Sequence, residues 1–237
     1  MKLTAITTCV GFDDYLRVCV KENEGLFDDW IIVTTPGDPC HDIEGVRFHE
    51  TDAFYRDGAP FNKGAAINSA LMDYNHEAEW LVLLDGDIIL PSDWRKKINV
   101  YPLDRNNIYG LYRNDCWDLP AYLGGDLSGL TPSHGNQHRG LGVGAFCLFH
   151  WCAETMQKRR EDGGPLYPVE FKTAVRSDRF HLKRWLPQHR EDTSKARSSA
   201  IAFGLPQEIF GRLVHFGTDC LRNKGNHKGR TTPRIDK

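Results

Sequence analysis

The chain has 237 residues, of which 40% are hydrophobic, 26% charged and 11% aromatic. This composition is typical of a soluble globular protein and excludes a disordered, collagen-like or coiled-coil chain. No apolar run approaches the roughly 20 residues of a membrane span. The start of the chain lacks the pattern of a signal peptide, so we expect a cytoplasmic protein without stable membrane insertion. The net charge of −2 hides an asymmetry, because residues 1–150 carry a net −10 and residues 151–237 a net +8.

The N-terminal part of the sequence alternates between strand and helix patterns. β-Branched and apolar runs predict buried strands, and apolar residues at helical spacing predict the helices between them. In chain order these elements are a strand at 3–10, a helix at 13–24, a strand at 30–35, a weak strand near 46–49, a helix at 63–74 and an apolar strand at 80–84. Such alternation predicts an α/β fold with helices on both faces of a Rossmann-type sheet.

The pattern is looser after residue 100. Residues 113–142 are rich in Gly, Asn, Asp, Pro and His and predict a long loop region. A Gly-led buried strand is expected at 140–151 and a helix at 178–186. The stretch 215–237 has few apolar residues and many basic ones. No linker separates two domains, so we expect a single domain over 1–237.

Two carboxylates directly follow the apolar strand at 80–84, in the sequence Asp85-Gly86-Asp87. In open α/β sheets the carboxyl ends of the strands are where ligands bind. Two hard oxygen ligands there would suit Mg²⁺ or Mn²⁺ bridging a diphosphate. The alternative is an ordinary turn, since Asp-Gly pairs are common in loops.

Three motifs together resemble a known family. LLDGD at 83–87 resembles the DxD motif of the GT-A glycosyltransferases, which use nucleotide-sugar donors, and FNKGAAIN at 61–68 resembles the helix that precedes it there. HFG at 215–217 and NHKGR at 226–230 resemble a closing segment of some bacterial and viral members. The resemblance is to family-2-like enzymes, including a viral member as one option. It implies a GT-A-like mixed sheet, with a nucleotide-sugar half at 1–100 and an acceptor half with a basic C-terminal segment at 101–237.

The resemblance also implies roles for single residues. Asp87 would be a direct ligand of Mn²⁺ or Mg²⁺, Asp85 would lie near the donor ribose and the metal, and His215 would complete the metal site. The other residues implied in binding the donor, a UDP- or GDP-sugar, are Thr7, Thr8, Asp38, Lys63, Lys228 and Arg230. Each has a plainer reading: β-forming residues at 7 and 8, a turn residue at 38, and solvated or core side chains at the others.

Sugar transfer also needs a base that takes the proton of the acceptor hydroxyl. The family places this base in an acidic motif at the start of a helix, and Arg176-Ser177-Asp178 is the best match, although Ser replaces the expected acidic residue. Asp178 would then act in a single inverting displacement, whereas a helix cap explains the same residue equally well. Asp126 and Glu170 are the alternatives for the base. Trp117, His134 and His138 are candidate acceptor contacts in the middle loop.

The acceptor is left open as a glycan, a small molecule or DNA. The basic C-terminal third favours one specific alternative, a viral enzyme that glycosylates hydroxymethylated bases in DNA. Two alternatives of other classes are a nucleotidyltransferase and a non-catalytic nucleotide-binding module.

The seven cysteines contain no CxxC pair, so their spacing indicates reduced thiols and argues against disulfides and against a structural zinc site.

Overall fold

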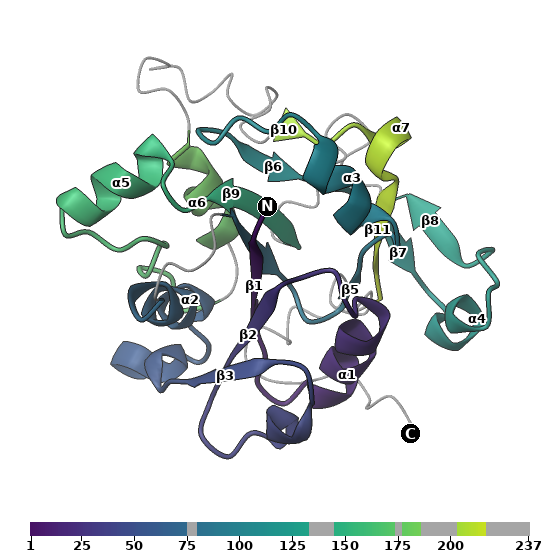
Figure 1. Ribbon diagram of the computed structural model, residues 1–237. Coiled ribbons are helices and arrows are strands. Elements are labelled where there is room, and N and C mark those ends of the chain that lie inside the picture. Colours follow the sequence, from purple (N-terminus) through teal and green to yellow (C-terminus); the bar gives the residue numbers. More distant parts are fainter. Residues whose placement is uncertain (75–79, 133–144, 174–176, 186–202, 217–237) are drawn as a thin grey trace.

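The computed structural model describes residues 1–74, 80–132, 145–173, 177–185 and 203–216. Two sheets and helices on either side of the larger one make up this part of the chain (Figure 1). None of its helices is long and apolar enough to cross a membrane.

The larger sheet has seven strands in the order β10-β6-β9-β4-β1-β2-β3. Parallel pairing joins β3, β2, β1 and β4, whereas β9 runs antiparallel to both β4 and β6, so the sheet is mixed. The strands span Leu3–Thr8 (β1), Asp29–Thr34 (β2), Arg47–Glu50 (β3), Trp80–Leu84 (β4), Ile108–Gly110 (β6), Phe146–His150 (β9) and Phe203–Gly204 (β10). All five residues of β4 are buried, as expected for a central strand covered on both faces.

A smaller sheet lies beside the first, in the order β5-β11-β7-β8. Its strands span Ile88–Ile89 (β5), Tyr112–Cys116 (β7), Leu130–Pro132 (β8) and Arg212–His215 (β11). β11 pairs with β5 antiparallel and with β7 parallel. Because β5 begins four residues after β4 ends, the turn at 85–87 joins the two sheets.

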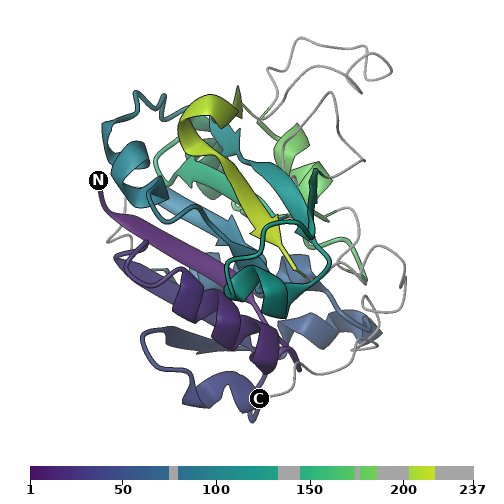
Figure 2. The same cartoon turned by 90° about the vertical axis from the view of Figure 1, so that its right-hand side faces the viewer.

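Helices cover both faces of the larger sheet, as the alternating pattern predicted (Figures 1 and 2). One apolar core lies under α1 (Asp13–Glu22) and α3 (Trp94–Val100), and includes Leu16 and Trp94. The other lies under α2 (Lys63–Met72) and α6 (Ser177–Lys183), and includes Leu71 and Leu182. The remaining helical elements are η1 (Pro39–Asp42), η2 (Ala53–Gly58), α4 (Leu119–Leu123), α5 (Glu154–Glu161) and α7 (Gln207–Phe210).

The long loop predicted at 113–142 is wrong for the part that the structure describes. β7, α4 and β8 lie within it. The sequence YRNDC of β7 has no apolar alternation, and three of its five residues are only partly buried. Its strand conformation comes from pairing with β8, which follows α4, and with β11, which lies far away in the chain. The local sequence of β7 therefore does not predict a strand.

Candidate functional site

Asp85 and Asp87 lie where β4 ends and the smaller sheet begins. The backbone N–H of Asp85 donates to the carbonyl of Ala145 at 3.0 Å, which ties the turn to the residue before β9. The backbone carbonyl of Asp87 accepts from the N–H of Phe216 at 3.1 Å, which ties it to the end of β11. The turn is therefore fixed from both sheets, and each carboxylate faces a different set of partners.

Asp85 belongs to a chain of charges that reaches α6. Its Oδ1 lies 2.6 Å from Nζ of Lys63, and the same Nζ lies 3.3 Å from Oδ1 of Asp178. Tyr167 donates a hydrogen bond from its hydroxyl to Asp178. Lys63 opens α2, and the preceding Asn62 caps that helix by accepting from the N–H of Ala65 at 2.8 Å. Three residues predicted from separate motifs thus meet at one place.

Asp87 belongs to a second chain that runs through the smaller sheet. Nε2 of His215 lies 3.3 Å from Oδ2 of Asp87, and Nδ1 of the same ring lies 3.3 Å from Oδ1 of Asp115. Nε of Arg113 lies 3.1 Å from that oxygen of Asp115. Direct pairing of His215 with Asp115 in the β11–β7 register positions the two side chains.

Asp115 and Tyr167 are the site residues that sequence reasoning missed. Asp115 is 4% exposed and Tyr167 is 1% exposed. Neither stands in a recognisable motif, and their burial depends on strand pairing and on helix packing. A buried carboxylate inside a polar strand is the signal that identifies Asp115, and it becomes visible only once the strand is placed.

The electrostatics differ between the two carboxylates. Burial raises the pKa of Asp85 to about 6 against the lowering effect of Lys63. Burial also tends to raise the pKa of Asp87, but His215 and other cations outweigh it and lower that pKa below its ordinary value. Burial lowers the pKa of His215 less than Asp87 and Asp115 raise it, and the pKa is about 9. Asp87 is consequently the carboxylate that stays ionised most firmly.

The site fits a divalent cation. Oδ1 of Asp87 is a buried atom with no hydrogen-bond partner among the residues that the structure describes, so a ligand position is left over. A carboxylate oxygen and an imidazole nitrogen, 3.3 Å apart, are donors that Mn²⁺ accepts, and carboxylates also suit Mg²⁺. Asp87 and His215 would hold the cation, with Asp85 beside them.

The residues predicted to bind the nucleotide base of the donor lie at or after the ends of the first two strands. Thr7 is 1% exposed, and its hydroxyl accepts from Nε1 of Trp30 at 2.9 Å. Asp38 is buried and accepts from the N–H groups of Gly11 at 2.7 Å and Cys40 at 3.0 Å. Both side chains serve hydrogen bonds within the fold, whereas Thr8 is partly exposed at the end of β1. Their contact with a nucleotide stays a prediction.

Four of the remaining candidates, Lys228, Arg230, His134 and His138, lie outside the described residues. The alternative bases have no described contact with the cluster: Asp126 accepts from the N–H of Ser128, and Glu170 is exposed. Trp117 is half exposed and donates to Thr131 at 2.8 Å.

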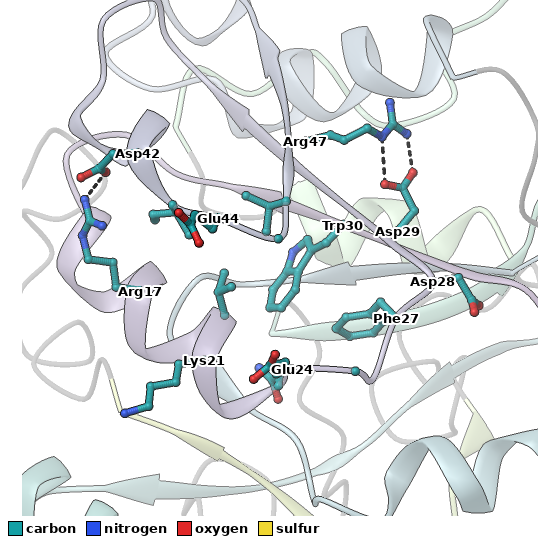
Figure 3. A pocket seen from close by; sticks show the side chains of 16 residues that line it. Arg17, Lys21, Glu24, Phe27, Asp28, Asp29, Trp30, Asp42, Glu44 and Arg47 are labelled. Atoms are coloured by element: carbon teal, nitrogen blue, oxygen red, sulfur yellow. Dashed lines mark hydrogen bonds and ion pairs between the residues drawn. The ribbon is translucent and has the colours of Figure 1, made fainter.

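A pocket of about 660 Å³ lies at the opposite end of the strands, where β2 begins (Figure 3). Trp30 and Phe27 line it, with charged side chains around them. Two ion pairs form among these charged side chains, Arg17 with Asp42 and Arg47 with Asp29. Neither Asp85 nor Asp87 lines this pocket, so it is separate from those carboxylates.

Comparison with solved structures identifies the fold. Residues covering 93% of this chain superpose on S. aureus TarS 1–349 with a TM-score of 0.55 and 11% identity, and they span 62% of that chain. The catalytic domain of Drosophila β1,4-galactosyltransferase 7, in complex with xylobiose, gives a TM-score of 0.50 and 9% identity over 99% of this chain and 76% of that one. No family model and no curated protein matches the sequence. The chain therefore has the GT-A fold that its motifs predicted.

Proposed function

We propose that this protein is a metal-dependent glycosyltransferase that moves a sugar from a nucleotide-diphosphate sugar to an acceptor hydroxyl. The observation that carries the proposal is the junction of Asp85, Asp87 and His215 at the carboxyl end of β4 in a GT-A fold. The buried Oδ1 of Asp87 leaves a position for a metal ion, which would displace the proton of His215 and take its place beside the carboxylate. The similarity to a galactosyltransferase catalytic domain supports sugar transfer.

The two halves of the chain would supply different residues to the reaction. Residues 1–100 supply Lys63, Asp85 and Asp87 for the donor, and residues 101–237 supply Asp178 and His215. A bound Mn²⁺ or Mg²⁺ would neutralise the charge that develops on the departing diphosphate. Lys63, at the start of α2, is held by two carboxylates and would bind oxygens of the donor there.

Asp178 is the proposed base. Its carboxylate lies 3.3 Å from Nζ of Lys63, the same nitrogen that contacts Asp85, and it comes from α6 in the second half of the chain. Tyr167 and Lys63 both bind Oδ1, and these contacts fix the orientation of the carboxylate. Abstraction of the acceptor proton by Asp178 implies direct attack on the anomeric carbon, with inversion.

A DNA acceptor is the narrower alternative, and the described basic residues favour it less than the charge count did. Arg160 stacks on Trp151 at 4.5 Å, and Arg184 donates to the carbonyl of Pro165 at 3.1 Å. Arg160 and Arg184 therefore make contacts within the fold, whereas Lys183 is exposed and lies 4.9 Å from the ring of Phe180. Salt-dependent binding of duplex DNA would support a DNA acceptor, and its absence would reject it.

The decisive experiment is a thermal-shift panel of UDP- and GDP-sugars, each with Mn²⁺ or with EDTA. A ligand at 100 times its Kd stabilises the folded state by about 2.7 kcal/mol, and we expect this shift with one donor and only with the metal. Asp87→Asn should abolish it. Asp93→Asn, an exposed carboxylate on the same segment, is the matched control and should leave it intact. A metal-independent shift, or none, would refute the proposal.

A further inference from the structure

A second cluster of metal-ligating side chains lies away from the carboxylates at 85 and 87. Cys9 follows β1, and Asp38 and Cys40 stand at the start of η1, after β2. One ligand atom from each lies within 4.8 Å of the other two. Cys9 is 3% exposed, Cys40 is fully buried and Asp38 is 7% exposed. Cys9 and Cys40 are 31 positions apart, so no finger-type spacing marks them in the sequence.

The backbone holds this cluster in place. The N–H of Cys9 donates to the carbonyl of Val33 at 2.9 Å, and this bond extends the pairing of β1 with β2. Asp38 caps η1 by accepting from the N–H of Cys40. The three side chains are therefore placed by the main sheet and by a helix cap.

The ligand types in this cluster suit a divalent cation of borderline softness. Two sulfurs and one carboxylate are ligands of Zn²⁺, which binds sulfur at about 2.3 Å and carboxylate oxygen at about 2.0–2.2 Å. Tetrahedral binding brings two sulfurs to about 3.8 Å, so ligand atoms within 4.8 Å need to contract by about 1 Å at most. Asp38 forms no ion pair with a cation among the described residues, although buried carboxylates are usually paired or bound to metal.

We propose that Cys9, Asp38 and Cys40 form a Zn²⁺ site that pins the loop after β1 to the start of η1. The fourth position falls to a water molecule or to the hydroxyl of Thr34, which lies 3.5 Å from the Cys40 sulfur. None of these residues is a proposed ligand of the catalytic metal, so the zinc titration and the donor-binding panel test different metal sites, although Asp38 is also among the residues predicted to bind the donor.

The charge balance of binding is defined. Two thiols each lose a proton to solvent as two Zn–S bonds form, while the Asp38 carboxylate binds without releasing one. The metal must displace the thiol protons, so zinc affinity should increase with pH.

The test is a zinc titration of the full chain, purified metal-free under reducing conditions, against a chromophoric chelator. We expect one Zn²⁺ per chain at this site, with release of two protons, measured by calorimetry in buffers of different ionisation enthalpy. Cys40→Ser should weaken zinc binding at least about 100-fold, because one of the three protein ligands is lost. Asp38→Asn, which keeps both thiols, should also weaken it and serves if the cysteine variant does not fold.

Matched controls separate this site from others. Cys19→Ser changes a fully buried thiol outside the cluster, and Asp87→Asn changes the proposed catalytic metal site. Both should leave the zinc affinity unchanged. Zinc that persists in Cys40→Ser but disappears in Asp87→Asn would overturn the proposal. Failure to bind zinc would also overturn the proposal. This holds if the two thiols stay free, and equally if mass analysis without reductant shows a Cys9–Cys40 disulfide.

Discussion

Asp178 presents the sharpest question at the scale of single residues, because the same carboxylate binds Lys63 and Tyr167. If Asp178 is the base, Asp178→Asn should leave metal-dependent donor binding within about twofold and lower the rate of transfer by about 10²–10⁴. Calorimetry gives the first quantity and single-turnover kinetics the second. Asp126→Asn is the control for the alternative base. Equal loss of donor binding and transfer in Asp178→Asn would assign this residue to the donor instead.

Asp115 is predicted to act through His215. A carboxylate that binds the second nitrogen of a metal-ligating histidine typically changes metal affinity about 10–100-fold, and we expect this loss of Mn²⁺ affinity in Asp115→Asn. Electron paramagnetic resonance of free Mn²⁺ measures it. Since both residues act at one ligand, the effects of Asp115→Asn and His215→Gln should not add. Additive losses, or a similar loss in the exposed Asp73→Asn, would contradict the coupling.

We predict that the stability of the fold depends on pH through His181. It is buried, stacks on Tyr167 at 4.6 Å, and its Nε2 lies 3.4 Å from Nε1 of Trp185, which donates to it. Burial lowers the pKa of His181 to about 3. The unfolded state, with a pKa near 6.5, therefore binds the proton first as the pH falls. Stability is complete above about pH 6.5 and decreases toward pH 3, by about 2 kcal/mol at pH 5.

Urea unfolding at pH 7.5 and pH 5 measures this contribution. His181→Phe keeps an aromatic ring at the position but cannot be protonated, so it should lose less stability than the parent protein between the two values. An identical pH dependence in parent and variant would show that other groups cause the loss.

At the scale of elements, a substitution at Gly64 tests how closely α2 packs against the segment at Pro168. Gly64 lies in its first turn, and a Cβ atom there would stand 1.8 Å from the carbonyl oxygen of Pro168. Glycine to alanine inside a helix ordinarily stabilises by about 1 kcal/mol. Here the close approach to Pro168 should reverse the sign, and Gly64→Ala should destabilise by about 1–3 kcal/mol. Gly164→Ala, whose nearest atom is 3.9 Å away, is the control for denaturant unfolding.

Asn23 carries the prediction at the scale of the whole molecule, because it links α1 to the smaller sheet. Its Nδ2 donates to the carbonyl of Ile88 and its Oδ1 accepts from the N–H of Leu90, both at 2.7 Å and buried. Asn23→Ala leaves the N–H of Leu90 without this partner, while the carbonyl of Ile88 keeps its contact with the thiol of Cys19 at 2.9 Å. Urea unfolding should therefore show a loss of about 1–3 kcal/mol, the cost of one unpaired buried group. The exposed bonds of Asn106 provide the control in Asn106→Ala, and an equal loss there would refute the link.

Several structural features were readable from local patterns. The apolar runs at 3–8 and 80–84 became adjacent strands of the larger sheet, and the helical spacing around Leu16 became α1. Asp85, Lys63 and Asp178 were each marked by motif, and the structure brings them together. Their proposed roles in transfer stay predictions. The smaller sheet, Asp115 and Tyr167 had no local mark because residues from distant segments determine their environment.

The sequence by itself determined the alternation of buried strands and amphipathic helices, and the place of two carboxylates at the end of a central strand. These properties depend on the spacing of residues close in the chain. The tertiary structure decided which partners those carboxylates face: Lys63 for Asp85, and His215, supported by Asp115, for Asp87. It also brought Cys9 and Cys40 together. Contacts of this kind depend on strand order and register, which pairing across the whole chain fixes and which local spacing does not encode.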